Sequence, residues 1–282
     1  LQYLLARESS ESVKVVLSGE GADEIFGGYP WYLYDKLARP FNQLPVGVQD
    51  LVTPMLPIPR LWRLRLKKLA QVPVAMGMER FAALVSRTER DLFDRVVSED
   101  LKRSAGSGDD NENEFRYPED YYRWTAFEQM QYLEIKTRMH DYILHSLDRS
   151  SMAQSLEARV PFLDHELVEL CAGIPPALKM RGWREKYILR RAFESVLPGE
   201  ILARRKRGLM APSGAWLKRR DLPWVDDMLS PGAVRSKGYF NAAEVTRILE
   251  AHRSGKRDCA SVLMSILSVQ VWDDLFVKGF RT

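Results

Sequence analysis

The chain has 282 residues, of which 45% are hydrophobic and 28% are charged, and its 42 basic residues nearly balance 38 acidic ones. This length and apolar content can bury the core of one large domain or somewhat more. The small net charge of +4 argues against a dedicated nucleic-acid-binding protein. Two cysteines, Cys171 and Cys259, are too few for a disulfide framework or a zinc site, so we expect a reducing cytoplasmic environment. We expect no membrane span, because no apolar run approaches the roughly 18 residues that a span requires.

The first predicted element is a β-strand at residues 13–17, Val-Lys-Val-Val-Leu, followed by a Ser-Gly-Glu-Gly turn that leads into a helix. The glycines permit positive φ, and a helix N-terminus offers N–H groups to phosphate. Glu20, Asp23 and Glu24 have i, i+3, i+4 spacing, so in a helical turn their carboxylates converge. Backbone amides that suit phosphate lie next to these carboxylates, which indicates that a Mg²⁺ ion lies between the carboxylates and the phosphate. Ordinary capping, with the serine as cap and acids in the first turn, explains the same pattern.

Helices are predicted over most of the remaining chain. The first is Tyr29–Leu37, which Pro40 ends. Apolar periodicity predicts further helices at residues 79–85, 90–97, 124–156, 164–174, 185–196, 242–252 and 261–276. In the helix that Asp164 caps, we expect Leu167, Val168, Leu170 and Cys171 to face inward. The polar stretch Ser104–Glu114 (residues 104–114) predicts a mobile loop between helical layers of one domain.

Two later stretches carry clustered charges. In residues 148–164, Glu157 and Arg159 lie among apolar residues and must be paired, exposed or in a polar pocket. They fit either an internal Arg–Glu network that locks two helices or the wall of a substrate pocket. Lys186 and the run Arg204–Arg207, which contains Lys206, supply cations. A basic run is by itself a solvated surface or a nucleic-acid patch, whereas ammonium groups beside phosphates stabilise the charge of a leaving pyrophosphate.

Three of these stretches closely resemble the synthetase domain of glutamine-dependent asparagine synthetases. They are Ser-Gly-Glu-Gly-Ala-Asp-Glu-Ile-Phe-Gly-Gly-Tyr at 18–29, Asp-Arg-Ser-Ser-Met-Ala-Gln-Ser-Leu-Glu-Ala-Arg-Val-Pro-Phe-Leu-Asp-His at 148–165, and Lys-Tyr-Ile-Leu-Arg at 186–190 with Arg-Arg-Lys-Arg-Gly-Leu at 204–209. The resemblance implies a mainly α chain with one strand near its N-terminus. Residues 1–282 would be the helical C-terminal portion of an α/β adenine-nucleotide alpha-hydrolase-like (ATP pyrophosphatase) synthetase domain. Leu209 departs from the family pattern, in which a Phe is common.

Family members also carry a Ser-Gly-Gly-x-Asp-Ser pyrophosphate loop upstream and an N-terminal glutaminase domain, and neither occurs in this sequence. We therefore expect a C-terminal fragment that is inactive alone. The resemblance implies that ATP and aspartate give β-aspartyl-AMP and pyrophosphate, and that ammonia from glutamine then gives asparagine. It implies ATP and Mg²⁺ as cofactors and the following site residues: catalytic Glu20 and Lys206; ATP- and pyrophosphate-binding Ser18, Gly19 and Lys186; aspartate-pocket Glu157 and Arg159; and the metal ligand Asp23.

Two alternatives remain open. The same adenylation chemistry serves β-lactam synthetases and peptide cyclases, although those that close an internal ring often place a Tyr where this chain has Glu20. A non-catalytic remnant would be expected to have lost its site residues, yet Glu20, Asp23, Lys186 and Lys206 are present. Partners would be the small-molecule substrates and the glutaminase domain, without nucleic acid or membrane. The acceptor substrate, the nitrogen source and assembly as a homodimer stay open.

Overall fold

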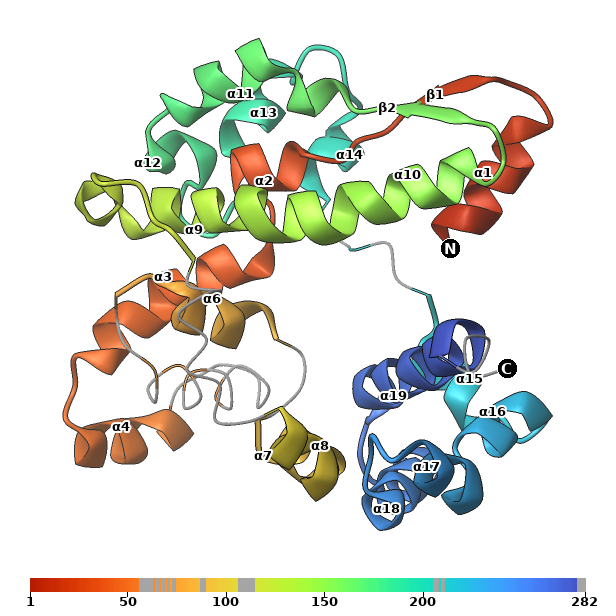
Figure 1. Ribbon diagram of the computed structural model, residues 1–282. Coiled ribbons are helices and arrows are strands. Elements are labelled where there is room, and N and C mark those ends of the chain that lie inside the picture. The colour runs from red at the N-terminus through yellow and green to blue at the C-terminus, as the bar shows by residue number, and fades with distance from the viewer. Residues whose placement is uncertain are drawn as a thin grey trace. The chain divides into compact units, whose positions relative to one another are not determined.

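The computed structural model describes residues 1–55, 63, 66, 69, 72, 75–86, 90–105, 115–204, 208 and 211–277 (Figure 1). The chain divides into two compact units. Unit 1 combines residues 1–85 with 115–209, and unit 2 combines residues 86–114 with 210–282. Of the predicted loop at residues 104–114, Ser104 is the last residue of a helix, and residues 106–114 lie outside the described part of the chain.

Unit 1 contains a short sheet among many helices. Its elements are α1 (Gln2–Ser10), β1 (Val15–Leu17), α2 (Ala22–Phe26), α3 (Pro30–Asn42), α4 (Val46–Val52), η1 (Thr53–Met55), α6 (Met78–Val85), η3 (Tyr121–Arg123), α9 (Ala126–Glu134), η4 (Ile135–Leu144, a π-helix), α10 (His145–Met152), β2 (Glu157–Arg159), η5 (Pro161–Leu163), α11 (His165–Ala172), α12 (Pro176–Lys179), α13 (Tyr187–Ala192) and α14 (Gly199–Ala203).

The sheet is a parallel pair of β1 and β2, in which Val15 lies opposite Glu157 and Leu17 opposite Arg159. The mainly helical fold is confirmed, but the prediction of a single strand was incomplete, because β2 occupies residues that follow a predicted helix without any strand pattern of their own. The helix ends at Met152, and Ser155 at φ 51° reverses the chain. The residues that follow then add to β1 rather than continuing the helix.

Helix α3 differs from its prediction because it runs through Pro40 to Asn42. Pro40 removes one backbone N–H donor, but the buried positions Tyr32, Asp35, Ala38 and Phe41 recur every three residues across it. Tertiary packing of this face therefore outweighs the local cost of the proline. The carboxylate of Asp35 is buried and pairs with Arg80 of α6 at 2.7 Å, which ties the two helices together.

The predicted helix at 124–156 is a continuous rod of α9, η4 and α10 (Figure 1). A capping box begins it, since Thr125 Oγ1 accepts from the backbone N–H of Glu128 while the Glu128 carboxylate accepts from the backbone N–H of Thr125. Met130 and Leu133 are buried in a cluster that also holds residues of α3 and α6. Helix α11 begins as predicted at its Asp164 cap. Leu170 of that helix is exposed rather than inward-facing, whereas Cys171 is buried beside α2.

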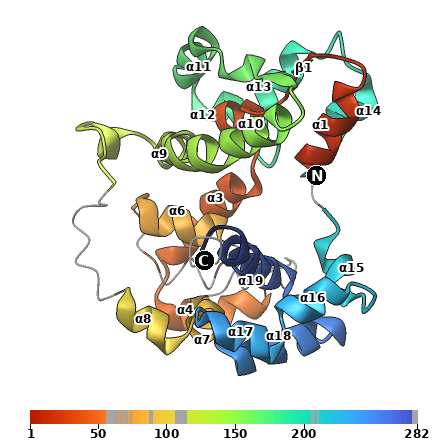
Figure 2. The ribbon, with the colours of Figure 1, turned by 45° about the vertical axis from the view of Figure 1, so that its right-hand side comes forward.

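Unit 2 is wholly helical in its described part. Its elements are α7 (Arg90–Val96), α8 (Glu99–Ser104), α15 (Ser213–Lys218), α16 (Pro223–Met228), α17 (Pro231–Lys237), α18 (Ala242–Arg253), α19 (Ala260–Trp272) and η6 (Asp273–Val277, a π-helix). Helices α15 to α19 gather side by side (Figure 2). Their shared core includes Val245 and Ile248 of α18 and Leu263 and Ile266 of α19.

Helix α19 and η6 together give one stretch, Ala260–Val277, with 18 residues and a mean hydropathy of 1.4. Length and composition therefore suffice for a membrane span, and the expectation that no apolar run reaches that length was wrong. Within unit 2 this stretch has another use, because Val262, Leu263, Ile266 and Leu267 are buried against the neighbouring helices. Packing inside a helical bundle explains its apolar character.

Candidate active site

The motif at residues 13–28 folds as a strand, a glycine turn and a short helix. Strand β1 leads to Ser18, whose backbone N–H donates to the carbonyl oxygen of Arg159 at 2.7 Å and so extends the ladder with β2. Helix α2 begins at Ala22 after Gly21, whose φ of 96° suits glycine. No side chain caps this helix. The prediction of Ser18 as the cap was therefore wrong, although Asp23 and Glu24 do lie in the first turn, as that explanation also expects.

Asp23 of α2 and Lys186 form an ion pair in which Asp23 Oδ1 lies 2.9 Å from Lys186 Nζ. Their side chains are only 16% and 18% exposed. Lys186 is the N-cap of α13 and adopts a left-handed backbone conformation with φ 52°. Because that region costs a non-glycine residue free energy, the surrounding structure must hold Lys186 there. The structure thus brings together two residues that lie 163 positions apart, the predicted metal ligand and a predicted pyrophosphate-binding residue.

Gly28 makes this pair sterically feasible. A Cβ atom on Gly28 would lie 2.0 Å from Asp23 Oδ1 and 2.3 Å from Lys186 Cε. The backbone N–H of Gly28 also donates to the Asp23 carbonyl oxygen at 2.8 Å, which closes the end of α2. The glycine pair after α2 is therefore part of the site and not merely a boundary between helices.

Two further carboxyl groups, Glu24 and Glu134, are completely buried next to the pair. Glu24 Oε1 accepts a hydrogen bond from Tyr29 Oη at 2.5 Å. Glu134 of α9 accepts one from Trp31 Nε1 at 3.2 Å and also pairs with Arg138. The Arg138 guanidinium lies 4.7 Å from the centre of the Trp31 ring, over its face. These contacts join α2, the start of α3 and the α9–η4 rod beneath the Asp23–Lys186 pair.

Burial raises the pKa of both carboxyl groups. For Glu134 it raises the pKa to about 8, even though the Arg138 charge acts in the opposite direction. For Glu24 burial is again the largest cause, the hydrogen bond from Tyr29 opposes it, and the charges of Asp23 and Glu20 add to it. The charges of Asp23 and Glu20 thus act on Glu24, although Glu20 precedes the helix and does not share a helical turn with the other two acids. Glu20 and Asp23 are partly buried, whereas Glu24 is buried.

Glu157 and Arg159 lie at the other side of the ladder, on β2. Their side chains are 57% and 62% exposed and pair with each other at 2.8 Å. Alternate residues of a strand share a face, so this pair belongs to one face of the sheet. The hypothesis of an internal network locking two helices was wrong for these residues, because they are exposed and lie on a strand. Their place in an aspartate pocket stays a prediction.

Other predicted residues receive less support from the geometry. Gly19 is exposed, and a Cβ atom on it would meet nothing within 4 Å. Its role in nucleotide binding stays a prediction, as does that of Ser18, whose backbone N–H is already used in the ladder. Lys206 lies outside the described residues.

Glu134 and Gly28 are site residues that sequence reasoning did not select, whereas Glu24 was grouped with Glu20 and Asp23 but was given no role. Glu24 and Gly28 lie inside the recognised motif, so the motif itself could have indicated them. Glu134 carries only a weak signal, a charged residue between Leu133 and Ile135 on a helix whose other residues are largely apolar. That signal cannot be distinguished from an exposed glutamate without the fold.

A strand, a glycine turn and a helix that hold an enclosed carboxylate–ammonium pair define an enzyme-like polar site, and comparison with known proteins gives its family. The model of the family described as asparagine synthase matches residues 1–274. The chain belongs to the asparagine synthase family. It is 30% identical to asparagine synthetase [glutamine-hydrolyzing] 1 of Bacillus subtilis (strain 168), over 98% of this chain and 43% of that protein.

Two other relatives have different names. A putative asparagine synthetase [glutamine-hydrolyzing] of Mycobacterium tuberculosis (strain H37Rv) is 32% identical over 98% of this chain and 41% of its own length. Amidase chyE of Penicillium rubens is 30% identical over 73% of this chain and 33% of its own length. The chain thus spans less than half the length of each of these relatives, and the recognition of a C-terminal synthetase part is confirmed.

Proposed function

We propose that the chain carries the synthetase site for ATP-dependent amide formation on aspartate, through β-aspartyl-AMP, with asparagine, AMP and pyrophosphate as products. The observation that carries this proposal is the enclosed Asp23–Lys186 pair at the end of β1. Its supporting context is the family of the chain and the names of its relatives. Ammonia would come from glutamine, as the relatives named glutamine-hydrolyzing asparagine synthetases suggest.

Adenylation separates the β- and α-phosphates of ATP, so negative charge grows on the pyrophosphate that leaves. Lys186 suits this step because its ammonium is a point charge on a flexible stem, held against Asp23 until phosphate oxygens compete for it. Lys206 is proposed to add a second cation. An aspartate carboxylate oxygen attacks the α-phosphorus, and pyrophosphate departs. Glu157 and Arg159 are proposed to bind the aspartate, and the backbone around Ser18 and Gly19 to hold the nucleotide.

Magnesium fits this site only in part. Among the described residues, no group of three or more His, Cys, Asp or Glu side chains could hold a metal ion. Mg²⁺ bound with nucleotides commonly takes one or two carboxylates, and phosphate oxygens and water complete its shell. Asp23 suits such a role as a single carboxylate ligand, and the ion would neutralise phosphate charge.

In the second step ammonia attacks the acyl carbon of the adenylate, AMP leaves, and one proton must be removed from the new ammonium. Glu20 is the proposed base. It lies close to the Glu24 carboxyl, which its charge affects. A carboxylate within reach of the attacking nitrogen is a suitable general base for this step.

The proposal is tested by Asp23→Asn in the complete gene product. The amide keeps the size of the side chain but cannot pair with Lys186 as an anion and is a poor ligand for a hard cation. We expect aspartate-dependent pyrophosphate release to fall about 10²-fold or more and to require a higher Mg²⁺ concentration. Asp100→Asn, at a carboxylate that is 82% exposed, is the matched control and should change neither. An Asp23→Asn protein with unchanged release and Mg²⁺ titration would remove this site from the reaction.

A further inference from the structure

Unit 1 contains a pocket of about 270 Å³ that shares neither residue of the Asp23–Lys186 pair. It lies between the α9–η4 rod and α11, and most of its wall is apolar or aromatic, including Tyr132, Ile135 and Val168. Ligand pockets in proteins have this character, with mostly apolar walls and a small number of polar groups that orient the ligand. The chemistry of the ligand must therefore be read from the polar groups.

The cationic group of the pocket is Lys179, the last residue of α12. The residue lines the pocket, and only 1% of its surface is exposed to solvent. Its Nζ donates one hydrogen bond, to Gln131 Oε1 at 2.9 Å. An ammonium has three N–H donors, and within the described part of the chain this one forms no ion pair and no second hydrogen bond. Burying a charge against a single neutral acceptor is unfavourable.

Glu128 also lines the pocket but does not neutralise Lys179 by direct contact. One of its carboxylate oxygens, Oε2, accepts hydrogen bonds from the backbone N–H and the hydroxyl of Thr125, at 2.8 and 2.7 Å. The carboxylate thus serves the capping box at the start of α9. Among the described residues, the Lys179 ammonium therefore keeps two donors for a ligand in the pocket.

We propose that this pocket binds a small apolar carboxylate, with the carboxylate on Lys179 and an aromatic or branched aliphatic body against Tyr132, Ile135 and Val168. A carboxylate supplies two acceptor oxygens for the two remaining donors, and hydrogen bonds between ionised partners are roughly twice as strong as neutral ones. The body of the ligand removes apolar wall surface from water. The size of the pocket restricts the ligand to about one ring or a comparably small branched chain.

The anchor of this pocket is also joined to the motif helix. Gln131, which accepts from Lys179, donates through Nε2 to the carbonyl oxygens of Glu24 at 2.6 Å and Ile25 at 3.0 Å. These carbonyls lie near the C-terminal end of α2, the helix that carries Asp23. A carboxylate on Lys179 would therefore hold Lys179 and Gln131 in place beneath α2, so that occupancy strengthens the support of that helix.

The test is isothermal titration of the 282-residue chain with phenylacetate as the probe. We expect saturable one-to-one binding that weakens about 10-fold or more in Lys179→Met, which keeps the apolar stem and removes the charge. Ala172→Phe, at a lining residue on α11, should abolish binding by filling the pocket while leaving Lys179 unsubstituted. Lys218→Met, at an exposed lysine of unit 2, is the matched control and should bind as the unsubstituted chain does.

Phenylacetamide, which has the same ring but no charge, should bind about 10-fold or more weakly than phenylacetate. Circular dichroism of each variant shows whether it is folded, and Ala172→Phe tests the pocket if Lys179→Met does not fold. No saturable phenylacetate binding up to about 10 mM would overturn the proposal. Equal affinity for the acid and the amide, or unchanged binding in Ala172→Phe, would also overturn it.

Discussion

At the scale of single residues, Gly28 shows how narrowly the Asp23–Lys186 pair is fitted. Its missing side chain leaves the space in which the carboxylate and the lysine stem meet, since a Cβ atom would lie 2.0 Å from Asp23 Oδ1. The contact involves two side chains that are themselves largely enclosed, so neither can move aside without losing the other. The glycine is therefore a constraint on the pair, even though it carries no chemistry of its own.

Gly28→Ala should separate Asp23 from Lys186 and destabilise unit 1 by about 1–3 kcal/mol, the usual cost of overpacking. Urea denaturation measures the stability, and aspartate-dependent pyrophosphate release by the complete gene product measures the site. Gly173→Ala is the control, because the nearest atom to a Cβ there, the Leu170 carbonyl oxygen, lies at an ordinary 3.5 Å. Equal results for the two variants would show that the pair tolerates displacement.

Glu134 gives a pH-dependent prediction. Its pKa in the folded chain is about 8, above the ordinary 4.5, so the fold favours the protonated form. The stability that protonation provides is complete below pH 4.5 and is lost as the pH rises toward 8. Over this window each pH unit should cost at most about 1.4 kcal/mol, the value for one proton.

Glu134→Gln stays neutral and should remove this contribution to the pH dependence. We expect the variant to gain stability relative to the unsubstituted chain as the pH rises from 5 to about 9, in urea denaturation at several pH values. The effect of the Arg138 charge on Glu134 is already part of the raised pKa and does not reverse this trend. A difference between the two proteins that is constant from pH 5 to 9 would contradict the raised pKa.

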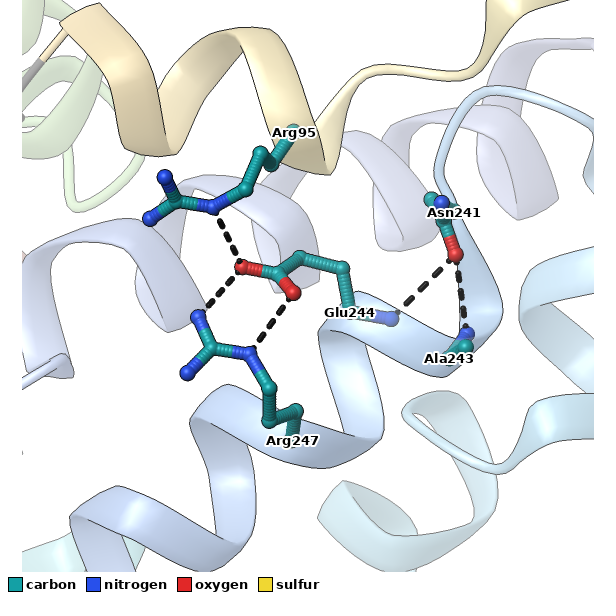
Figure 3. A network of polar contacts seen from close by, with 5 residues as sticks. All are labelled: Arg95, Asn241, Ala243, Glu244 and Arg247. Carbon is teal, nitrogen blue, oxygen red and sulfur yellow. Dashed lines mark hydrogen bonds and ion pairs between the residues drawn. The ribbon is translucent and has the colours of Figure 1, made fainter.

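At the scale of elements, a charged network joins α7 to α18 in unit 2 (Figure 3). Glu244 lies between two guanidinium groups, with Oε1 3.1 Å from Arg95 Nε and 2.6 Å from Arg247 Nη2. Asn241 caps the same helix by accepting from the N–H groups of Ala243 and Glu244. The hydrogen bond from Arg247 is the largest cause that lowers the pKa of Glu244, to about 2, and the hydrogen bond from Arg95 adds to it, although partial burial acts in the opposite direction.

Because the folded pKa is lowered, the network stabilises unit 2 above the ordinary pKa of 4.5, and this stability is lost as the pH falls toward 2. Glu244→Gln should cost about 1 kcal/mol at pH 7 and much less at pH 2.5. Glu99→Gln is the control, because that carboxylate is 77% exposed and pairs within its own helix. Thermal unfolding of the three proteins at both pH values measures the effect, and equal stability of the two variants at pH 7 would remove the network as a link between helices.

Elements also show what a sequence can predict. The strand, turn and helix at residues 13–28 and the helix that Asp164 caps depend on neighbours within a few residues, and both were predicted correctly. Strand β2 depends on pairing with β1, about 140 residues earlier, so no local pattern marks it. The continuation of α3 through Pro40 likewise depends on the packing of its buried face, which local propensity does not include.

At the scale of the whole molecule, the family was recognisable from three separated motifs, and the family model confirms it over residues 1–274. The site was only partly predictable. The ion pair of Asp23 with Lys186 cannot be predicted without the fold. Residue types show that a buried charge needs a partner, but they do not show which residue that partner is. The burial of Glu134 and Lys179 is a property of the packed unit for the same reason.

The division of unit 2 into two chain segments has a consequence for the order of folding. The backbone N–H of Asn241 donates to the carbonyl oxygen of Val96, and Ser98 Oγ donates to the carbonyl oxygen of Gly238. The two segments of unit 2 must therefore meet, although residues 115–209, which belong to unit 1, separate them in the sequence. During synthesis, α7 and α8 emerge more than 100 residues before their partners and have no core of their own to join. Closing so long a loop carries an entropic cost that grows only slowly with its length. Assembly of unit 2 therefore waits until its second segment has been translated. Until then the apolar side chains of α7 remain exposed, which makes them targets for chaperones.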